Sequence, residues 1–134
     1  MDYRDIYRRS LSDPDGFWME QARAIDWVTP PSKALFADKA PLYEWFKDAE
    51  VNTCWNAVDR HVEAGRGDQA AIIHDSPITG SSRTLSYRAL RDRVALLAGA
   101  LRAKGVEKGD RVIIYMPMIP EALEAMLACA RLGA

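Results

Sequence analysis

The stretch VIIYM, residues 112–116, decides the fold class that we predict for this chain. Its five apolar residues lie between the turn-forming residues EKGD at 107–110 and Pro117. A strand in a parallel sheet is covered on both faces, so its sequence is a short, continuous apolar run. We therefore expect residues 112–116 to form a buried strand of a parallel sheet.

The segments on both sides of this stretch have helical patterns. Ser86 is typical of a helix N-cap, and residues 87–104 carry apolar side chains at spacings of three and four. Pro120 begins a second helix over 121–132, and Gly133 ends it. The sides of this second helix are nearly all Ala, Leu, Met and Cys, so we expect it to be packed on more than one side.

Two short runs with strand character precede these helices. Residues 69–74 and 83–85 are separated by turn-forming residues at 75–82, which predicts a hairpin. Strand, crossover helix, strand and helix then follow one another along the chain. This order predicts the α/β fold class.

The chain divides into two regions of different character. Residues 1–65 hold all four tryptophans and most of the prolines, with a helix beginning at Asp13-Pro14 and another over 52–64. We interpret 1–65 as a helical and irregular N-terminal arm, and 66–134 as the first strand–helix units of a domain with an incomplete sheet. Because the sequence stops at RLGA, residues 131–134, where such a sheet needs another strand, we expect a truncated domain of a larger enzyme.

The composition excludes several classes of partner. The net charge is -1, which gives no overall attraction to nucleic acid or to an anionic membrane. No apolar stretch approaches the length of a membrane span or of a signal peptide core. The two cysteines, Cys54 and Cys129, are far apart in apolar helical stretches and are interpreted as buried side chains in a reducing compartment. We expect a cytoplasmic protein.

Sequence motifs identify no catalytic group. The phosphate-binding patterns GxxxxGK[ST] and GxGxxG do not occur, and TGSS at 79–82 fits a hairpin turn better than a phosphate loop. His61 and His74 are the only histidines. A small hydrolase that uses one of them is an alternative, but no GxSxG elbow accompanies them.

Two further clusters have structural interpretations that we prefer. The basic residues of the predicted helix 87–104 are typical of a solvated helix face rather than a nucleic-acid site. The aromatic pairs are interpreted as packing anchors rather than as a ligand site. We therefore assign no catalytic, cofactor-binding or metal-binding residue. The basic residues are Arg88, Arg91, Arg93, Arg102 and Lys104, and the aromatic pairs are Phe17-Trp18 and Trp45-Phe46.

Several segments resemble the N-terminal portion of AMP-forming short-chain acyl-CoA synthetases, which are adenylate-forming enzymes. The resemblance covers essentially the whole chain, and its last block is the most specific. Within the family, the sequence before residue 30 resembles propionyl-CoA synthetases more than acetyl-CoA synthetases. The segments are FWMEQA (17–22), IDWVTP (25–30), WF (45–46), NTCWNAVDRH (52–61), GDRV (109–112), YMPMIPEA (115–122) and MLACARLGA (126–134).

The resemblance implies a ligase reaction in two steps. ATP adenylates propionate or acetate and releases pyrophosphate, and coenzyme A then displaces AMP to give acyl-CoA. In the family this chemistry needs Mg²⁺, and its phosphate-binding loop, ribose-binding aspartate, catalytic lysine and coenzyme A segment have no counterpart in residues 1–134. No site residue is carried over, so we expect this piece to be an inactive scaffold that binds no cofactor.

Two other expectations follow for the isolated chain. An apolar strand at 112–116 without a neighbour would leave a reactive sheet edge, so we expect self-association. A non-catalytic module that binds a partner, such as the rest of the enzyme, is the alternative to a scaffold.

Because no phosphate-binding motif is present, the isolated chain should show no propionate-dependent exchange of pyrophosphate into ATP above background. Incorporation of labelled pyrophosphate into ATP measures this exchange, with a complete acyl-CoA synthetase assayed alongside. Robust exchange by the isolated chain would overturn the scaffold interpretation.

Overall fold

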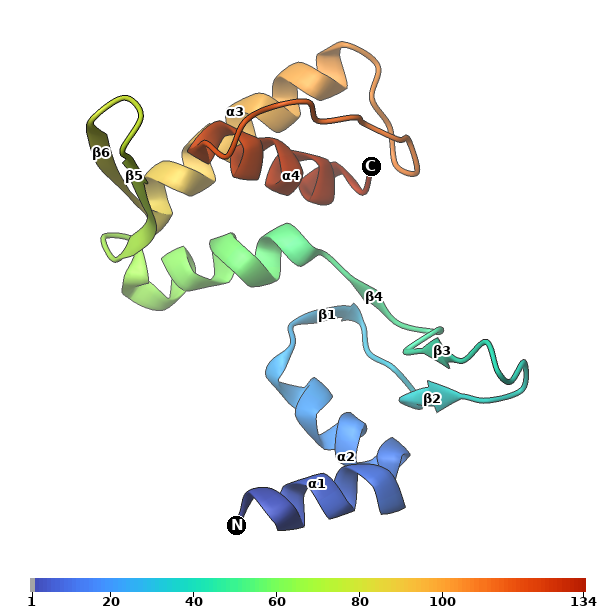
Figure 1. Ribbon diagram of the computed structural model, residues 1–134. Coiled ribbons are helices and arrows are strands. Elements are labelled where there is room, and N and C mark those ends of the chain that lie inside the picture. Colours follow the sequence, from blue (N-terminus) through green and yellow to red (C-terminus); the bar gives the residue numbers. More distant parts are fainter. Residues whose placement is uncertain (1) are drawn as a thin grey trace. The chain divides into compact units, whose positions relative to one another are not determined.

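The computed structural model describes residues 2–134, and these form two compact units, Met1–Val51 and Asn52–Ala134. Figure 1 labels their helices and strands. Because the two units are separate bodies, each is described by itself. Within the described residues, no helix combines the length and the apolar character needed to cross a membrane.

The first unit contains short helices and two small antiparallel sheets. Strand β1 pairs with β4, and β2 pairs with β3. Asp13 and Pro14 begin α2 as predicted, because the Asp13 side chain accepts a hydrogen bond from the backbone N–H of Gly16 at 3.0 Å. The elements are α1 (Tyr3–Ser12), α2 (Pro14–Gln21), η1 (Ala22–Ala24), β1 (Trp27–Thr29), β2 (Leu35–Phe36), β3 (Glu44–Trp45) and β4 (Glu50–Val51).

Aromatic rings and one carboxylate connect the elements of this unit. Asp15 accepts hydrogen bonds from the backbone N–H groups of Ala34 and Leu35, at 2.8 and 3.1 Å, and so ties α2 to β2. The ring of Trp18 on α2 packs edge-on against Trp45 on β3, with 6.0 Å between centroids. Here the aromatic side chains act as packing anchors between α2 and the small strands.

The second unit consists of one hairpin and a group of helices. The predicted helix over 52–64 is present as two π-helical turns, and Asn52 caps it by accepting a hydrogen bond from the N–H of Trp55 at 3.0 Å. The elements are η2 (Trp55–Asp59), η3 (Val62–Arg66), β5 (Ala70–Ser76), β6 (Ser81–Ser86), α3 (Tyr87–Ala103) and α4 (Pro120–Leu132).

Local signals in the sequence place the hairpin and the helix ends correctly. Strands β5 and β6 pair in antiparallel register from Ala70↔Ser86 to Ser76↔Ser81. Ser86 caps α3 by accepting a hydrogen bond from the N–H of Ala89 at 3.2 Å. Pro120 begins α4, and Gly133 ends it in the left-handed region, with φ of 81°.

The core of Asn52–Ala134 lies where the helix at 53–66 meets α3 and α4. Figure 1 shows α3 and α4 running beside each other. Small residues on α4 allow this close packing, whereas Leu123 and Met126 on its other side are exposed, so α4 buries only one face among the described residues. The central side chains, none more than 3% exposed, are Cys54, Val58, Leu90, Val94, Ala98 and Ala128.

An ion pair joins the two ends of this unit. Arg131 on α4 donates hydrogen bonds to both carboxylate oxygens of Asp59, at 2.8 and 2.7 Å. The side chain of Asp59 is 12% exposed and that of Arg131 is 28% exposed. The side-chain amide of Asn52 also donates to the backbone carbonyl of Arg131 at 3.2 Å. The helix at 53–66 is therefore linked to α4 by polar contacts as well as by its apolar side.

The buried strand expected at 112–116 is not formed within the described chain, and its place inside a larger sheet stays a prediction. This segment is extended but belongs to no sheet, and Ile113 is 92% exposed. A strand requires a hydrogen-bonded neighbour, and β5 and β6 pair only with each other. The broader fold class is confirmed as helices with small antiparallel sheets and an incomplete sheet layer.

Replacing Asp59 by Asn should lower the free energy of unfolding by about 2–4 kcal/mol, because Arg131 would lose its carboxylate partner in a largely buried position. Asp92→Asn is the matched control, since its carboxylate pairs with Arg91 but is 57% exposed. The control should change stability by less than about 0.5 kcal/mol. Urea denaturation followed by circular dichroism measures both variants, and equal losses would contradict the role given to Asp59.

Candidate functional site

A cavity of about 820 Å³ lies between the β5–β6 hairpin and the start of α4. Its ionisable side chains are His74, Asp75 and Arg83 on the hairpin, with His74 opposite Arg83 in the register, and Glu121 in the first turn of α4. It is the largest of the cavities that we describe, so it is the first candidate for a binding site.

An ion pair spans this cavity. One terminal nitrogen of Arg83 donates to both carboxylate oxygens of Glu121 at 2.7 Å. These hydrogen bonds hold the pKa of Glu121 below its ordinary value. The His74 Nδ1 atom is buried and has no hydrogen-bond partner within residues 2–134. The cavity therefore offers an ion pair that connects the hairpin to α4, without an acid–base pair aimed at a common point.

The two histidines lie in different surroundings. The ring of His61, which lies between η2 and η3, packs edge-on against Tyr87 with 5.1 Å between centroids. His74 lies on β5, opposite Arg83 in the register of the hairpin. The structure does not bring them together, and the hydrolase alternative gains no support from these positions.

Cys54 lies close to a carboxylate and an arginine. Its sulfur is 3.7 Å from Oδ2 of Asp59, which in turn binds Arg131. Burial raises the pKa of the Cys54 thiol above its ordinary value. Because the thiolate is the reactive form, this side chain is an unreactive member of the core, as the sequence predicts for both cysteines.

The basic residues of α3 are more strongly paired than the sequence indicates. Arg93 donates to the buried carboxylate of Glu124 on α4 at 2.8 Å. Arg91 contacts Glu63 and Asp92, and Arg88 contacts Asp68 at 3.4 Å. These three side chains bind acidic groups of the same unit, so they do not form a free cationic surface for nucleic acid.

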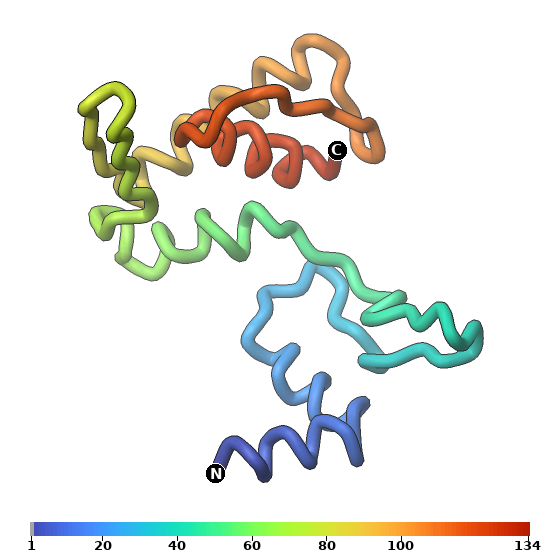
Figure 2. The backbone as a smooth tube through the Cα atoms, in the orientation of Figure 1, coloured from blue at the N-terminus to red at the C-terminus, as the bar shows by residue number. Residues whose placement is uncertain are grey.

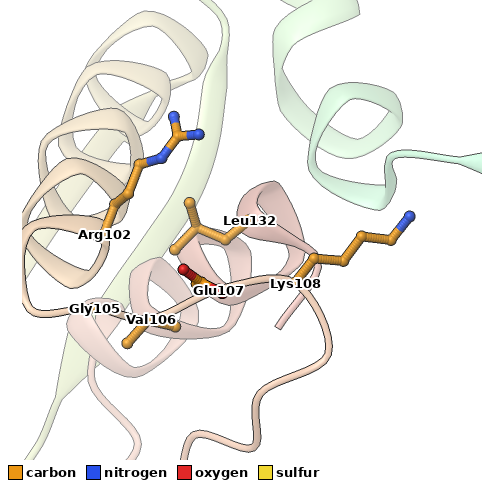
Figure 3. Close-up of a pocket in the computed structure, with 6 residues that line it drawn as sticks. All are labelled: Arg102, Gly105, Val106, Glu107, Lys108 and Leu132. Atoms are coloured by element: carbon orange, nitrogen blue, oxygen red, sulfur yellow. The ribbon is translucent and has the colours of Figure 1, made fainter.

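A second cavity, of about 330 Å³, lies at the C-terminal ends of α3 and α4. Figure 3 shows that its cationic side chains, Arg102 and Lys108, extend from separate segments and that their charged ends lie apart. The stem of Lys108 instead lies along Gly133, where an added Cβ would come within 3.1 Å of its Cγ. Helix C-termini also carry partial negative charge, so this cavity is poorly suited to a phosphate.

A third cavity, of about 270 Å³, lies in the first unit and is lined by the aromatic side chains of Trp18, Trp45 and Phe46. Phe46 has φ of 48°, in the left-handed region that bulky residues rarely adopt. None of the three lining side chains carries a charge. The cavity is an apolar surface between packed rings.

The described residues do not fit the ATP, Mg²⁺ and coenzyme A that the resemblance implies. Within residues 2–134, no three His, Cys, Asp or Glu side chains gather as metal ligands. Of the cationic groups in the two cavities of Asn52–Ala134 described above, Arg83 binds Glu121, and Arg102 and Lys108 lie apart. No cluster of donors is left to hold a phosphate, and no reaction step can be derived from these residues.

Sequence reasoning missed the pairs that connect distant segments, Asp59–Arg131 and Arg93–Glu124. One signal was present, because Arg131 lies inside the apolar helical stretch 126–134. A charged residue in such a position is rarely buried without a partner of opposite charge. The pattern could indicate that Arg131 has a partner, but not which one.

The thiols of the native chain should react with Ellman's reagent at least about 100-fold more slowly than free cysteine, because both are buried and access requires opening of the core. In urea both should react at the rate of free cysteine. Ser82→Cys, on an exposed position of β6, is the control and should add one rapidly reacting thiol. Rapid reaction of Cys54 in the native chain would contradict its place in the core.

Comparison with known protein families agrees with the resemblance. Residues 3–57 match the family described as acetyl-coenzyme A synthetase N-terminus, and residues 58–134 match the family described as AMP-binding enzyme.

Individual relatives match along nearly the whole chain. Over all 134 residues the chain is 54% identical to an uncharacterized protein of Pseudomonas aeruginosa, and it covers 21% of that protein. It is 48% identical over 133 residues, 99% of this chain, to rat acyl-CoA synthetase short-chain family member 3, mitochondrial, and covers 20% of it. It is 51% identical over 130 residues, 97% of this chain, to acetyl-coenzyme A synthetase of Streptomyces avermitilis, and again covers 20%.

The chain thus spans about a fifth of the length of these relatives. The AMP-binding match alone accounts for more than half of its residues. The chain therefore belongs to the AMP-binding enzyme family, and its first 57 residues are of the acetyl-coenzyme A synthetase N-terminal type.

Proposed function

We propose that residues 1–134 form the N-terminal part of an AMP-forming acid–coenzyme A ligase. This ligase converts a short-chain acid, ATP and coenzyme A into acyl-CoA, AMP and pyrophosphate. The observation that carries the proposal is that the two family regions, 3–57 and 58–134, follow each other directly in this chain. Along nearly its whole length the chain is also about half identical to the rat and Streptomyces avermitilis synthetases. We propose propionate as the acid, because the sequence of the first thirty residues resembles propionyl-CoA synthetases more than acetyl-CoA synthetases. Acetate is the other candidate.

In this proposal the chain contributes a scaffold rather than reactive groups. Three ion pairs support this role, because each one connects different elements of Asn52–Ala134. They are Asp59–Arg131, Arg93–Glu124 and Arg83–Glu121. ATP, Mg²⁺ and coenzyme A would be held by residues outside this chain.

We also propose that residues 1–65 are the N-terminal arm and that residues 66–134 begin the AMP-binding domain. The matched family regions meet at 57/58, and the compact units meet at 51/52, so the boundary at 65/66 stays a prediction. A cytoplasmic location stays a prediction as well. The rat relative carries the word mitochondrial in its name.

One observation favours a second candidate function, a non-catalytic module that binds a partner. The segment 112–118 is extended, apolar and largely exposed. A partner protein that covers this segment would give the chain a binding function without catalysis.

A chimera tests the ligase proposal. The matched residues of the Streptomyces avermitilis acetyl-coenzyme A synthetase would be replaced by the corresponding residues of this chain. We expect acetate-dependent ATP–pyrophosphate exchange with KM values for acetate and ATP within about threefold of the unmodified enzyme, since the exchanged residues supply no substrate contact.

The same chimera with Asp59→Asn is the matched control. It should melt at a lower temperature while its KM values stay unchanged, because Asp59 acts through Arg131 on the fold. A chimera that folds but shows no exchange would contradict the ligase proposal. A KM for ATP raised by more than about tenfold would contradict the scaffold role.

A further inference from the structure

We draw no further inference here: the strongest candidate, the cavity lined by the β5–β6 hairpin and the start of α4, whose backbones Figure 2 traces, carries nothing because Arg83 already binds Glu121 and, in a chain that spans about a fifth of the length of its relatives, nothing in the structure shows what fills the rest of the cavity.

Discussion

The largely buried contact between Asp59 and Arg131 is the constraint on which the second unit depends. A carboxylate in a largely apolar position is costly unless a cation and hydrogen bonds accompany it. Arg131 supplies both, with two hydrogen bonds to Asp59, and its carbonyl accepts from Asn52. The pair therefore links the helix at 53–66 to α4 beside Cys54, whose sulfur lies 3.7 Å from Asp59.

The remaining polar groups follow the same principle. Arg93 reaches the buried Glu124, and Arg83 reaches Glu121, so the charged groups beside the core serve the packing of α4 against α3 and the hairpin. What this unit lacks is a set of polar groups that converge on an empty point. In our proposal, these ion pairs give the chain a scaffold role in a larger enzyme.

The sequence predicted those features that local chemistry determines. Asp13, Ser86, Pro120 and Gly133 mark helix ends because each side chain, or its absence, acts on the backbone within a few residues. The hairpin followed for the same reason. No strand forms at 112–116 within the described chain, because a ladder depends on a distant partner, which five apolar residues cannot specify. The ion pairs were not predicted for a similar reason, since Asp59 and Arg131 are 72 positions apart in the sequence.

That separation has a consequence for the chain during its synthesis. A ribosome adds about 5–20 residues each second, so roughly 4–14 s pass between the addition of Asp59 and that of Arg131. Throughout this interval the Asp59 carboxylate has no Arg131 to pair with, so the contact that links the helix at 53–66 to α4 is among the last to form during synthesis.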